Sequence, residues 1–438
     1  MSNEPNTVAV SVEARTIRKL WIRVIPFLFL LYVICYVDRI NIGFAALTMN
    51  QDLAITSQQY GLVAGIFFFG YFIFEIPSNL LLHKIGARIW IARILITWGV
   101  LATLTGFVHT VQQLCIVRFL LGLAEAGYFP GIVLYLTYWF RWREQARAVA
   151  LFLTGLPTAS ILGAPLSGLI LDHVHWLGVS SWRWLLILEG IPAIVCGVLT
   201  YFLLPSRPAE ARFLTPEEKD WLQADLTHEE QRKLEQHRYS VFQAMANERV
   251  WRLATIHFGM MIGLYSLSFW LPLLVKSLFS KYSNSVVGFL IAIPNLAGFL
   301  GMIVISRNSD RRRERRYHAA IPAIIGGLAV ALLGASRSSF FSLILLSFLA
   351  VGAYSYCGPF WSLPCEFLTG FSAAAGIALI NSVGNLGGFV GPYAIGAISK
   401  ITGSLYVGLA FVGVSMLVSA TLLLLLPRGA RAHAGQPG

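Results

Sequence analysis

The chain alternates between long apolar runs and short polar connections. A helix that crosses a bilayer needs about 20 mostly apolar residues, and twelve such runs follow one another along the sequence. We therefore predict an all-α membrane protein with twelve transmembrane helices, at residues 22–46, 59–82, 90–109, 112–138, 147–171, 182–204, 252–277, 286–306, 317–336, 340–364, 372–399 and 404–426.

One polar stretch, residues 205–251, separates the runs into two groups of six. Within it, Thr215-Pro216-Glu217-Glu218 has the pattern of a helix start, with Thr215 as the N-cap and Pro216 at the first helical position. We expect a solvated, partly helical connector, with a regulatory or docking role as the open alternative. The predicted organisation is a tail at 1–20, a six-helix half at 21–204, the linker at 205–251, a second half at 252–427 and a tail at 428–438.

The basic residues alternate between the two sides of the predicted membrane. Because cytoplasmic connections are enriched in Lys and Arg, the richer side is predicted to be cytoplasmic, together with both termini and the linker. That side receives Arg15, Arg18, Lys19, Arg23, Lys84, Arg88, Arg141, Arg143, Arg147, Arg311, Arg312, Arg313, Arg315 and Arg316, and the other receives Lys276, Lys281, Arg337 and Lys400. The net charge of +12 is thus explained by topology rather than by nucleic-acid binding.

Composition excludes several classes of protein. With 56% hydrophobic and 12% charged residues, the chain is too apolar to be a soluble domain. Its five cysteines lie in or at the ends of apolar runs without metal-ligand spacing, which argues against disulfides or a zinc site. No cleavable signal peptide, nucleophile elbow or phosphate-binding loop is evident. We expect no enzyme activity, no metal and no cofactor.

Four ionisable side chains lie deep in the apolar runs of the first half, where such residues are functional candidates by default. They are Asp38, Arg39, Arg118 and Glu125. Two buried guanidinium groups suit a carboxylate ligand, because each offers a planar fork for bidentate binding. Two buried carboxylates suit proton coupling, because their protonation responds to neighbouring charge. Static pairs, Asp38 with Arg39 and Arg118 with Glu125, are the open alternative.

Other polar residues in the runs are weaker candidates. We expect Glu75 and Glu189 to be structural, with Glu75 paired to a loop arginine, and His257 to lie at the membrane interface. Asn381 and Asn385 are four residues apart and therefore share one helix face. The candidate cavity residues of the second half are Tyr265, Asn295, Tyr354, Tyr356, Trp361 and Asn381.

The loop after the second run, from His83 to Arg88, resembles the signature loop of the major facilitator superfamily, and the loop around Asp310 and Arg311 is a weak second copy. Further segments are similar to the anion:cation symporter family within it, above all to bacterial tartrate, phthalate and hydroxyphenylacetate permeases. They are Tyr36-Val-Asp38-Arg39-Ile-Asn41, Phe74-Glu75-Ile-Pro77-Ser-Asn79, Arg118-Phe-Leu-Leu-Gly122-Leu-Ala-Glu125-Ala-Gly127 and Asn381-Ser-Val-Gly384-Asn385.

The resemblance implies two pseudo-symmetric six-helix halves that rock around a central site. It implies that Asp38 and Glu125 couple protons, and that Arg39, Tyr71 and Asn385 hold the substrate. We add Arg118 from its charge and depth. It also implies gating by the two loops, His83–Arg88 and Asp310–Arg311. His83 stands where the family has an acid, which puts the usual charge pair of that loop in doubt.

The predicted function is secondary active import of a small organic anion, a carboxylate or dicarboxylate such as tartrate or phthalate. Protons are the coupling ion, and transport proceeds by symport and alternating access. We expect a monomer in the lipid bilayer of the cytoplasmic (inner) membrane. A proton-coupled exporter or exchanger and a non-transporting membrane sensor remain alternatives. The residues do not identify the organic acid.

Overall fold

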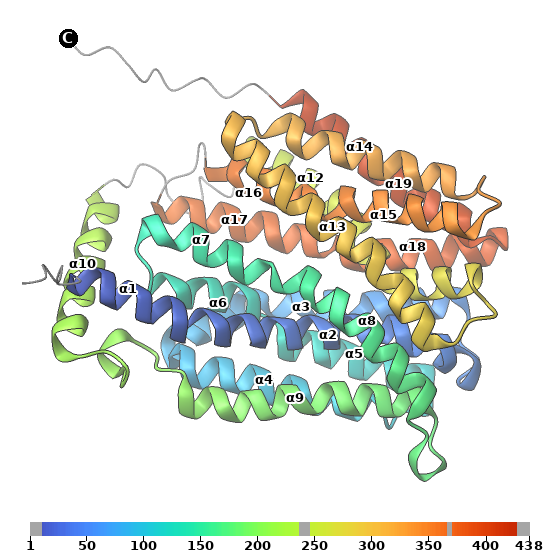
Figure 1. The fold of residues 1–438 in the computed structure, drawn as a ribbon, viewed down its shortest axis with the longest axis horizontal. Coiled ribbons are helices and arrows are strands. Elements are labelled where there is room, and N and C mark those ends of the chain that lie inside the picture. Colours follow the sequence, from blue (N-terminus) through green and yellow to red (C-terminus); the bar gives the residue numbers. More distant parts are fainter. Residues whose placement is uncertain (1–10, 236–245, 366–369, 427–438) are drawn as a thin grey trace, which may run out of the picture.

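The computed structural model describes residues 11–235, 246–365 and 370–426, and within these ranges the regular elements are all helices (Figure 1). The first half of the chain forms a bundle that occupies the lower part of Figure 1. Its helices are α1 Val12–Arg23, α2 Ile25–Asp52, α3 Ser57–Ile85, α4 Ala87–Thr105, α5 Val111–Glu125, α6 Tyr128–Thr137, α7 Trp142–Leu153, α8 Gly155–His173 and α9 Ser181–Leu203, with a short 3-10 turn at Trp176–Gly178.

The second half forms a similar bundle, coloured yellow to red in the upper part of Figure 1. Its helices are α12 Glu248–Leu278, α13 Asn284–Arg312, α14 Arg316–Leu333, α15 Ser339–Ser355, α16 Cys357–Cys365, α17 Gly370–Asn385, α18 Gly387–Thr402 and α19 Leu405–Leu425. Eleven helical segments of the described chain are long and apolar enough to cross a membrane. The predicted span 372–399 coincides with α17 and α18, which are separated at Leu386.

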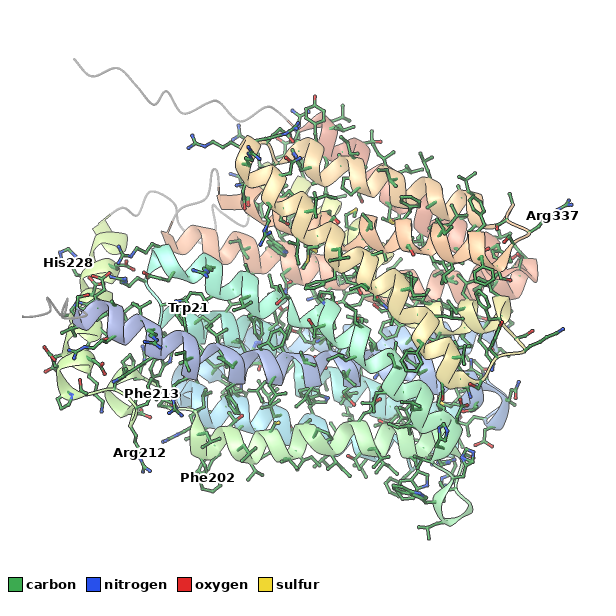
Figure 2. The ribbon with its side chains drawn as sticks, viewed as in Figure 1. Trp21, Phe202, Arg212, Phe213, His228 and Arg337 are labelled. Carbon is green, nitrogen blue, oxygen red and sulfur yellow. The ribbon has the colours of Figure 1, made fainter. Side chains whose placement is uncertain are left out.

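Large apolar side chains cover the outside of the bundle, as a lipid environment requires. Phe202, for example, is 73% exposed and projects from the lower edge in Figure 2. An exposed apolar surface of this extent is unusual for a soluble protein. The first described residues, α10 and the last turn of α19 lie at one end of the bundle, on the left in Figure 1. We call this the termini end, and the opposite end, where Arg337 lies in Figure 2, the far end.

The far end is held closed by contacts between the two halves. The Asp172 carboxylate of α8 accepts hydrogen bonds from the first backbone N–H groups of α13, at 3.1 Å from Asn284 and 2.6 Å from Ser285. Helices α3 and α18, and α8 and α13, also cross very closely. A Cβ atom would strike the partner helix's backbone at Gly61, Gly65, Gly168, Gly288 and Gly396. Small residues permit this approach.

At the termini end, the linker packs against the first half instead of being solvated. Helix α10 spans Pro216–Glu235, after a 3-10 turn at Pro208–Glu210. The predicted helix start is confirmed, because Thr215 and Glu218 each accept a hydrogen bond from the other's backbone N–H, at 3.3 and 2.9 Å. Glu218 also pairs with Lys19 of α1 at 2.7 Å. The expectation of a free connector was therefore wrong for this part of the linker.

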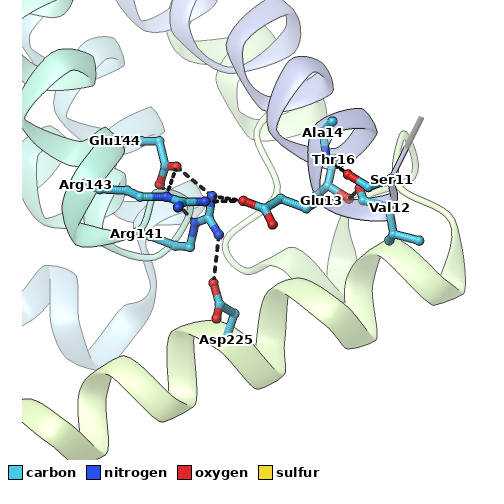
Figure 3. A network of polar contacts seen from close by, with 9 residues as sticks. All are labelled: Ser11, Val12, Glu13, Ala14, Thr16, Arg141, Arg143, Glu144 and Asp225. Carbon is cyan, nitrogen blue, oxygen red and sulfur yellow. Dashed lines mark hydrogen bonds and ion pairs between the residues drawn. The ribbon is translucent and has the colours of Figure 1, made fainter. Parts of the chain in front are cut away.

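Figure 3 shows the network that joins three elements at this surface. Arg141, at the start of α7, contacts Glu13 of α1 at 2.9 Å, Glu144 at 2.6 Å and Asp225 of α10 at 3.2 Å. These three carboxylates hold the pKa of the Arg141 guanidinium above its usual value, although its burial acts in the opposite direction. The network ties α1, α7 and α10 into one surface on the first half.

Candidate functional site

The site is built where two helices of the first half touch. The backbones of α3 and α5 approach so closely that a Cβ on Gly70 or Gly122 would strike the partner's backbone. Small residues make such crossings possible in membranes. The contact places the Phe67 ring of α3 beside the side chain of Arg118 on α5.

Two of the predicted site residues end a helix in the middle of a span. Glu125 is the last residue of α5, and the chain turns through Gly127 (φ +83°) before α6 begins. A positive φ of this size suits glycine, which has no Cβ. Asn385 is the last residue of α17, but Leu386 after it keeps helical angles (φ −63°, ψ −22°), so α18 continues from α17 with only a local irregularity. Interrupted helices such as α5 and α6 form the binding sites of many transporters.

Arg39 of α2 and Glu125 form a buried ion pair. The Cys35 thiol also donates a hydrogen bond to the same Glu125 oxygen, at 3.2 Å. The second oxygen, Oε2, is buried and has no hydrogen-bond partner within the described chain. The open alternative of a static Arg118–Glu125 pair is not what the structure has, since Glu125 pairs with Arg39.

The Arg39 guanidinium is also surrounded by aromatic rings. Its Cζ lies 4.9 Å from the ring centre of Tyr36, 5.3 Å from Phe67 and 5.5 Å from Tyr71. Cation–π contacts of this kind stabilise a guanidinium without neutralising its charge. Tyr71, predicted to hold the substrate, thus lies against the cation of the site.

Arg118 is buried, with 2% of its surface exposed, and packs its guanidinium over Phe67 at 5.2 Å. Its Nε and Nη2 are buried and have no hydrogen-bond acceptor among the described residues. Buried polar groups are normally paired, and an unpaired buried guanidinium is especially costly. Arg39 and Arg118 therefore both lie over the Phe67 ring. Among the described residues, Arg39 has an acidic partner, Glu125, and Arg118 has none within ion-pair distance.

Asp38 has neutral partners rather than Arg39. It accepts a hydrogen bond from the Trp98 indole at 2.5 Å and one from the Asn41 amide at 3.1 Å. The Asp38–Arg39 pair considered from the sequence is therefore not formed. Nearby, Glu189 accepts a hydrogen bond from Ser167 at 2.8 Å, wholly within the first half.

The second half meets this site through Tyr265 of α12. Its hydroxyl lies 3.4 Å from Nη1 of Arg39 and donates to the Asn385 side chain at 3.3 Å. We call Arg39, Glu125, Tyr265 and Asn385 the central cluster. It is a continuous polar chain that runs from an acid in one half to an amide in the other.

Three other candidates lie outside the central cluster. Asn295 accepts a hydrogen bond from Tyr354 at 3.0 Å, and Tyr354 lies 3.4 Å from Ser160 of the first half. Asn381 donates to Glu75 rather than to the cluster. Trp361 packs edge-on against His257 at 4.9 Å.

His257 is enclosed by other side chains of the second half, and its predicted position at the membrane interface stays a prediction. Its ring stacks on Phe360 with 5.1 Å between ring centres, and its Nδ1 lies 3.1 Å from the Tyr356 hydroxyl. It is only 2% exposed.

With this geometry described, comparison with known proteins decides the family. The model of the Major Facilitator Superfamily matches residues 28–392. The chain belongs to the Major Facilitator Superfamily. It is therefore a multi-pass membrane transport protein and not an enzyme, and the predicted all-α fold of this superfamily is confirmed.

Individual members of the superfamily cover nearly the whole chain. An Agrobacterium vitis protein named "Putative tartrate transporter" is 46% identical over 426 residues, which are 97% of this chain and 94% of that protein. A "Quinolone resistance transporter" of Acinetobacter baumannii is 39% identical over 94% of both chains. The crystal structure of a D-xylose-proton symporter has a TM-score of 0.74 at 14% identity, over 93% of this chain and 98% of that chain, and shows the shared fold.

The first superfamily loop has a partner in the linker, and the second has one within its own half. Arg88 lies 3.8 Å from Glu210 in the linker, and Asp310 pairs with Arg315. Arg311, at the end of α13, is exposed. The side chain of His83 lies outside the described part of the structure, so its predicted gating role stays a prediction.

Sequence reasoning missed several side chains that complete this superfamily site. Cys35 has no role in the sequence analysis beyond the argument against disulfides and a zinc site, yet its thiol donates a hydrogen bond to Glu125. Phe67 was not singled out, although both arginines lie over its ring. Trp98 was not predicted either, because a tryptophan in an apolar run is usually a packing residue. In the structure its indole N–H donates a hydrogen bond to the Asp38 carboxylate.

Proposed function

We propose that this protein imports a small organic anion, a carboxylate or dicarboxylate such as tartrate, by proton symport and alternating access. One observation supports the anion most directly. Arg118 is a buried cation whose Nε and Nη2 have no acceptor within the described chain. A ligand carboxylate is the natural acceptor for such a fork. The relative named as a tartrate transporter supports this substrate class.

The Arg39–Glu125 pair gives a route from proton binding to anion binding. While Glu125 is ionised, it forms an ion pair with the Arg39 guanidinium and competes with any other anion for it. A proton on Glu125 would neutralise that partner and free Arg39 for a substrate carboxylate. Because the pair is buried, protonation of Glu125 would leave the Arg39 guanidinium without a negative partner, which is unfavourable unless another anion binds to it. Proton and substrate therefore favour each other's binding, which is the requirement for symport.

Asp38 is proposed as a second proton site. Its partners, Trp98 and Asn41, are neutral donors, so no cation fixes its charge at hydrogen-bond distance. The neighbouring Arg118 is close enough to act on it electrostatically. A substrate carboxylate that reaches Arg118 would change that field, which links the second site to the same ligand.

The arrangement of the two halves supports the proposal of alternating access. Asp172 and the close helix crossings hold the far end closed. The positive-inside pattern predicts that the termini end faces the cytoplasm. We propose that the halves rock about the central cluster, whose polar chain joins them through Tyr265 and Asn385. We further propose that the protein works as a monomer in the inner membrane.

The test is uptake of radiolabelled tartrate into proteoliposomes with an imposed pH gradient. Symport predicts accumulation when the outside is more acidic, and none when the gradient is reversed. Glu125→Gln is expected to keep tartrate counterflow, because it imitates the protonated acid, and to lose gradient-driven accumulation. Full accumulation by Glu125→Gln would remove that residue from the coupling. Protein-free liposomes measure leakage.

A proton-coupled exporter is the second candidate, and the relative named as a quinolone resistance transporter favours it. The same proteoliposomes separate the two directions of coupling. An exporter that exchanges substrate for protons accumulates its substrate when the inside is more acidic. If tartrate fails in both gradients, a thermal-shift screen against other organic acids identifies the ligand, because a ligand stabilises the state that it binds.

A further inference from the structure

Glu75 has partners that its position in the sequence does not suggest. It was expected to pair with a loop arginine, and the structure contradicts this. Its Oε1 accepts a hydrogen bond from Asn381 Nδ2 at 2.9 Å, and its Oε2 accepts one from Ser382 Oγ at 2.7 Å. Both donors belong to α17 in the second half. The buried carboxylate therefore joins the two halves directly.

This contact lies between the central cluster and the termini end. Helix α3 runs toward the termini end, and Glu75 follows Tyr71 by four residues. Helix α17 runs the other way, and Asn381 precedes Asn385 by four residues. Each step is one helical turn, or about 6 Å along the axis. The Glu75 contact is thus the next polar layer below the central cluster on the route to the termini end.

The layer can close or release because α3 has a weak point beside it. Pro77 lies inside α3, two residues after Glu75. Proline cannot donate the helical hydrogen bond and commonly marks a bend. A small change at Glu75 can therefore be transmitted to the last turns of α3 without disturbing the close α3–α5 crossing.

The charges around Glu75 come from one side only. From α17 it meets the neutral amide of Asn381 and the hydroxyl of Ser382. Arg39 of α2 acts on it electrostatically, without a hydrogen bond between them, and Tyr71 of α3 is the neighbouring titratable group. Glu125 of α5 is engaged by Arg39. Because both donors to Glu75 are neutral, the strength of their hydrogen bonds depends on the negative charge of the Glu75 carboxylate.

We propose that Glu75 is a proton-controlled latch between the halves, on the termini side of the substrate site. The ionised carboxylate accepts from both α17 donors and holds this layer closed. When a proton from solution binds one carboxyl oxygen, that oxygen becomes a donor and a poor acceptor. The O–H can still meet the Ser382 hydroxyl, but the Asn381 N–H loses a charged acceptor. Hydrogen bonds to a charged group are roughly twice as strong as neutral ones.

The latch gives the proposed symport a third coupling carboxylate. A protonated carrier would open toward the termini end and release its substrate, whereas the ionised, empty carrier would keep that layer closed while the far end opens. This purpose rests on the proposed function. The latch itself does not, because its closure can be measured without any substrate.

The experiment is hydrogen–deuterium exchange of the purified full-length protein between pH 5 and 9. The readout is the exchange rate of amides 376–385 in α17, compared at each pH between the parent and Glu75→Gln, so that the intrinsic pH dependence of exchange cancels. At pH 9 the parent is expected to exchange at least about tenfold more slowly than the variant, as for a hydrogen bond to a charged group. At pH 5 the two are expected to converge.

Glu189→Gln is the matched control, because Glu189 is a buried carboxyl of the same half whose hydrogen-bond partners, Ser167 and Asn41, also belong to the first half. It should leave the α17 ratio unchanged. If Glu75→Gln does not fold, Ser382→Ala takes its place. It removes one donor and keeps the carboxylate, so it should change the exchange rate in the same direction but by less. A parent-to-variant ratio that is flat with pH, or an equal effect of Glu189→Gln, overturns the latch. Failure of the parent to transport organic anions would instead overturn the proposed function and leave this exchange result intact.

Discussion

In the first half of the bundle, six ionisable side chains are buried within the spans, namely Asp38, Arg39, Glu75, Arg118, Glu125 and Glu189. In the described part of the second half, no Asp, Glu, Lys or Arg is buried, and His257 is the buried titratable side chain other than tyrosine and cysteine. The second half instead offers neutral phenols, amides and hydroxyls. At the central cluster and at Glu75, the polar contacts across the interface join one kind of group to the other.

This difference indicates a division of labour. A proton changes the charge of the first half and leaves the second half chemically unchanged. The second half can nevertheless respond, because Tyr265, Asn381 and Ser382 donate to, or accept from, charged groups across the interface. Under the proposed proton coupling, charge on one side and neutral hydrogen bonds on the other would make the relative position of the halves depend on protonation.

The comparison predicts that the largest losses come from the charges of the first half. Arg39→Ala and Arg118→Ala should each reduce the initial rate of tartrate uptake in proteoliposomes by about 100-fold or more, since each would leave a substrate carboxylate buried without its cationic partner, which costs about 3–5 kcal/mol. Arg→Lys should restore only part of the rate, because the planar fork is lost.

Arg93→Ala is the control for this pair, because Arg93 lies in a span of the same half but stacks on Trp90, outside the site. Thermal unfolding of each variant separates loss of fold from loss of binding. If both alanine variants bind and transport tartrate like the parent, the anion hypothesis fails.

Asp38 should give the next largest effect. Asp38→Asn is expected to lower gradient-driven accumulation about tenfold or more and to preserve counterflow, because the proton is no longer carried at this site. Trp98→Phe removes a hydrogen bond but keeps the carboxylate, so it should retain accumulation at a reduced rate. Accumulation and counterflow are measured side by side. An Asp38→Asn protein that simply unfolds at lower temperature, with coupling intact per folded molecule, would make Asp38 structural.

Changes in the second half should be milder and of another kind. Asn385→Ala removes the neutral Tyr265–Asn385 hydrogen bond of the central cluster, and Tyr265→Phe removes that bond together with the 3.4 Å contact between its hydroxyl and Arg39. A neutral hydrogen bond contributes about 0.5–1.5 kcal/mol, so the KM for tartrate should rise about three- to tenfold. The accumulation ratio at saturating tartrate should stay at the parent value. Loss of that ratio in either variant would contradict the division between the halves.

The sequence predicted the all-α fold and the start of α10, because each depends on local composition and pattern. The partners of the buried ionisable residues were predicted poorly, because they depend on packing between distant helices. Glu75 and its partner Asn381 are 306 residues apart, and Arg39 and Glu125 are 86 apart. The position of Glu75 near the end of an apolar run suggests a partner in the following loop. Because α3 and α17 lie close together, Asn381 and Ser382 of α17 are its partners instead. Similarly, the pattern at Thr215 predicted the start of α10 but not the surface on which α10 packs.

The smallest effect is expected at the linker, which touches the first half far from the central cluster. Burial of Glu218 opposes its ionisation, but the Lys19 ammonium and the Thr215 backbone N–H donate to it and hold the pKa of this carboxyl below its usual value. A carboxyl with a lowered pKa stabilises the docked state fully above its usual pKa of about 4.5, and the stabilisation is lost as the pH falls through the lower, docked value.

Glu218→Gln should therefore release α10 partly at pH 7, at a cost of about 1 kcal/mol, which is typical of a helix cap together with an ion pair near the surface. The measurement is amide exchange of residues 216–229 at pH 7 and pH 4, where the parent should approach the variant only at the lower pH. Asp220→Asn, on the same helix but exposed, is the control. Tartrate uptake should change by less than about twofold, because 1 kcal/mol spent on docking α10 does not alter the charges that bind the anion. A larger change in uptake than in exchange would mean that the linker regulates transport, and the charge difference between the halves would then not be the whole basis of coupling.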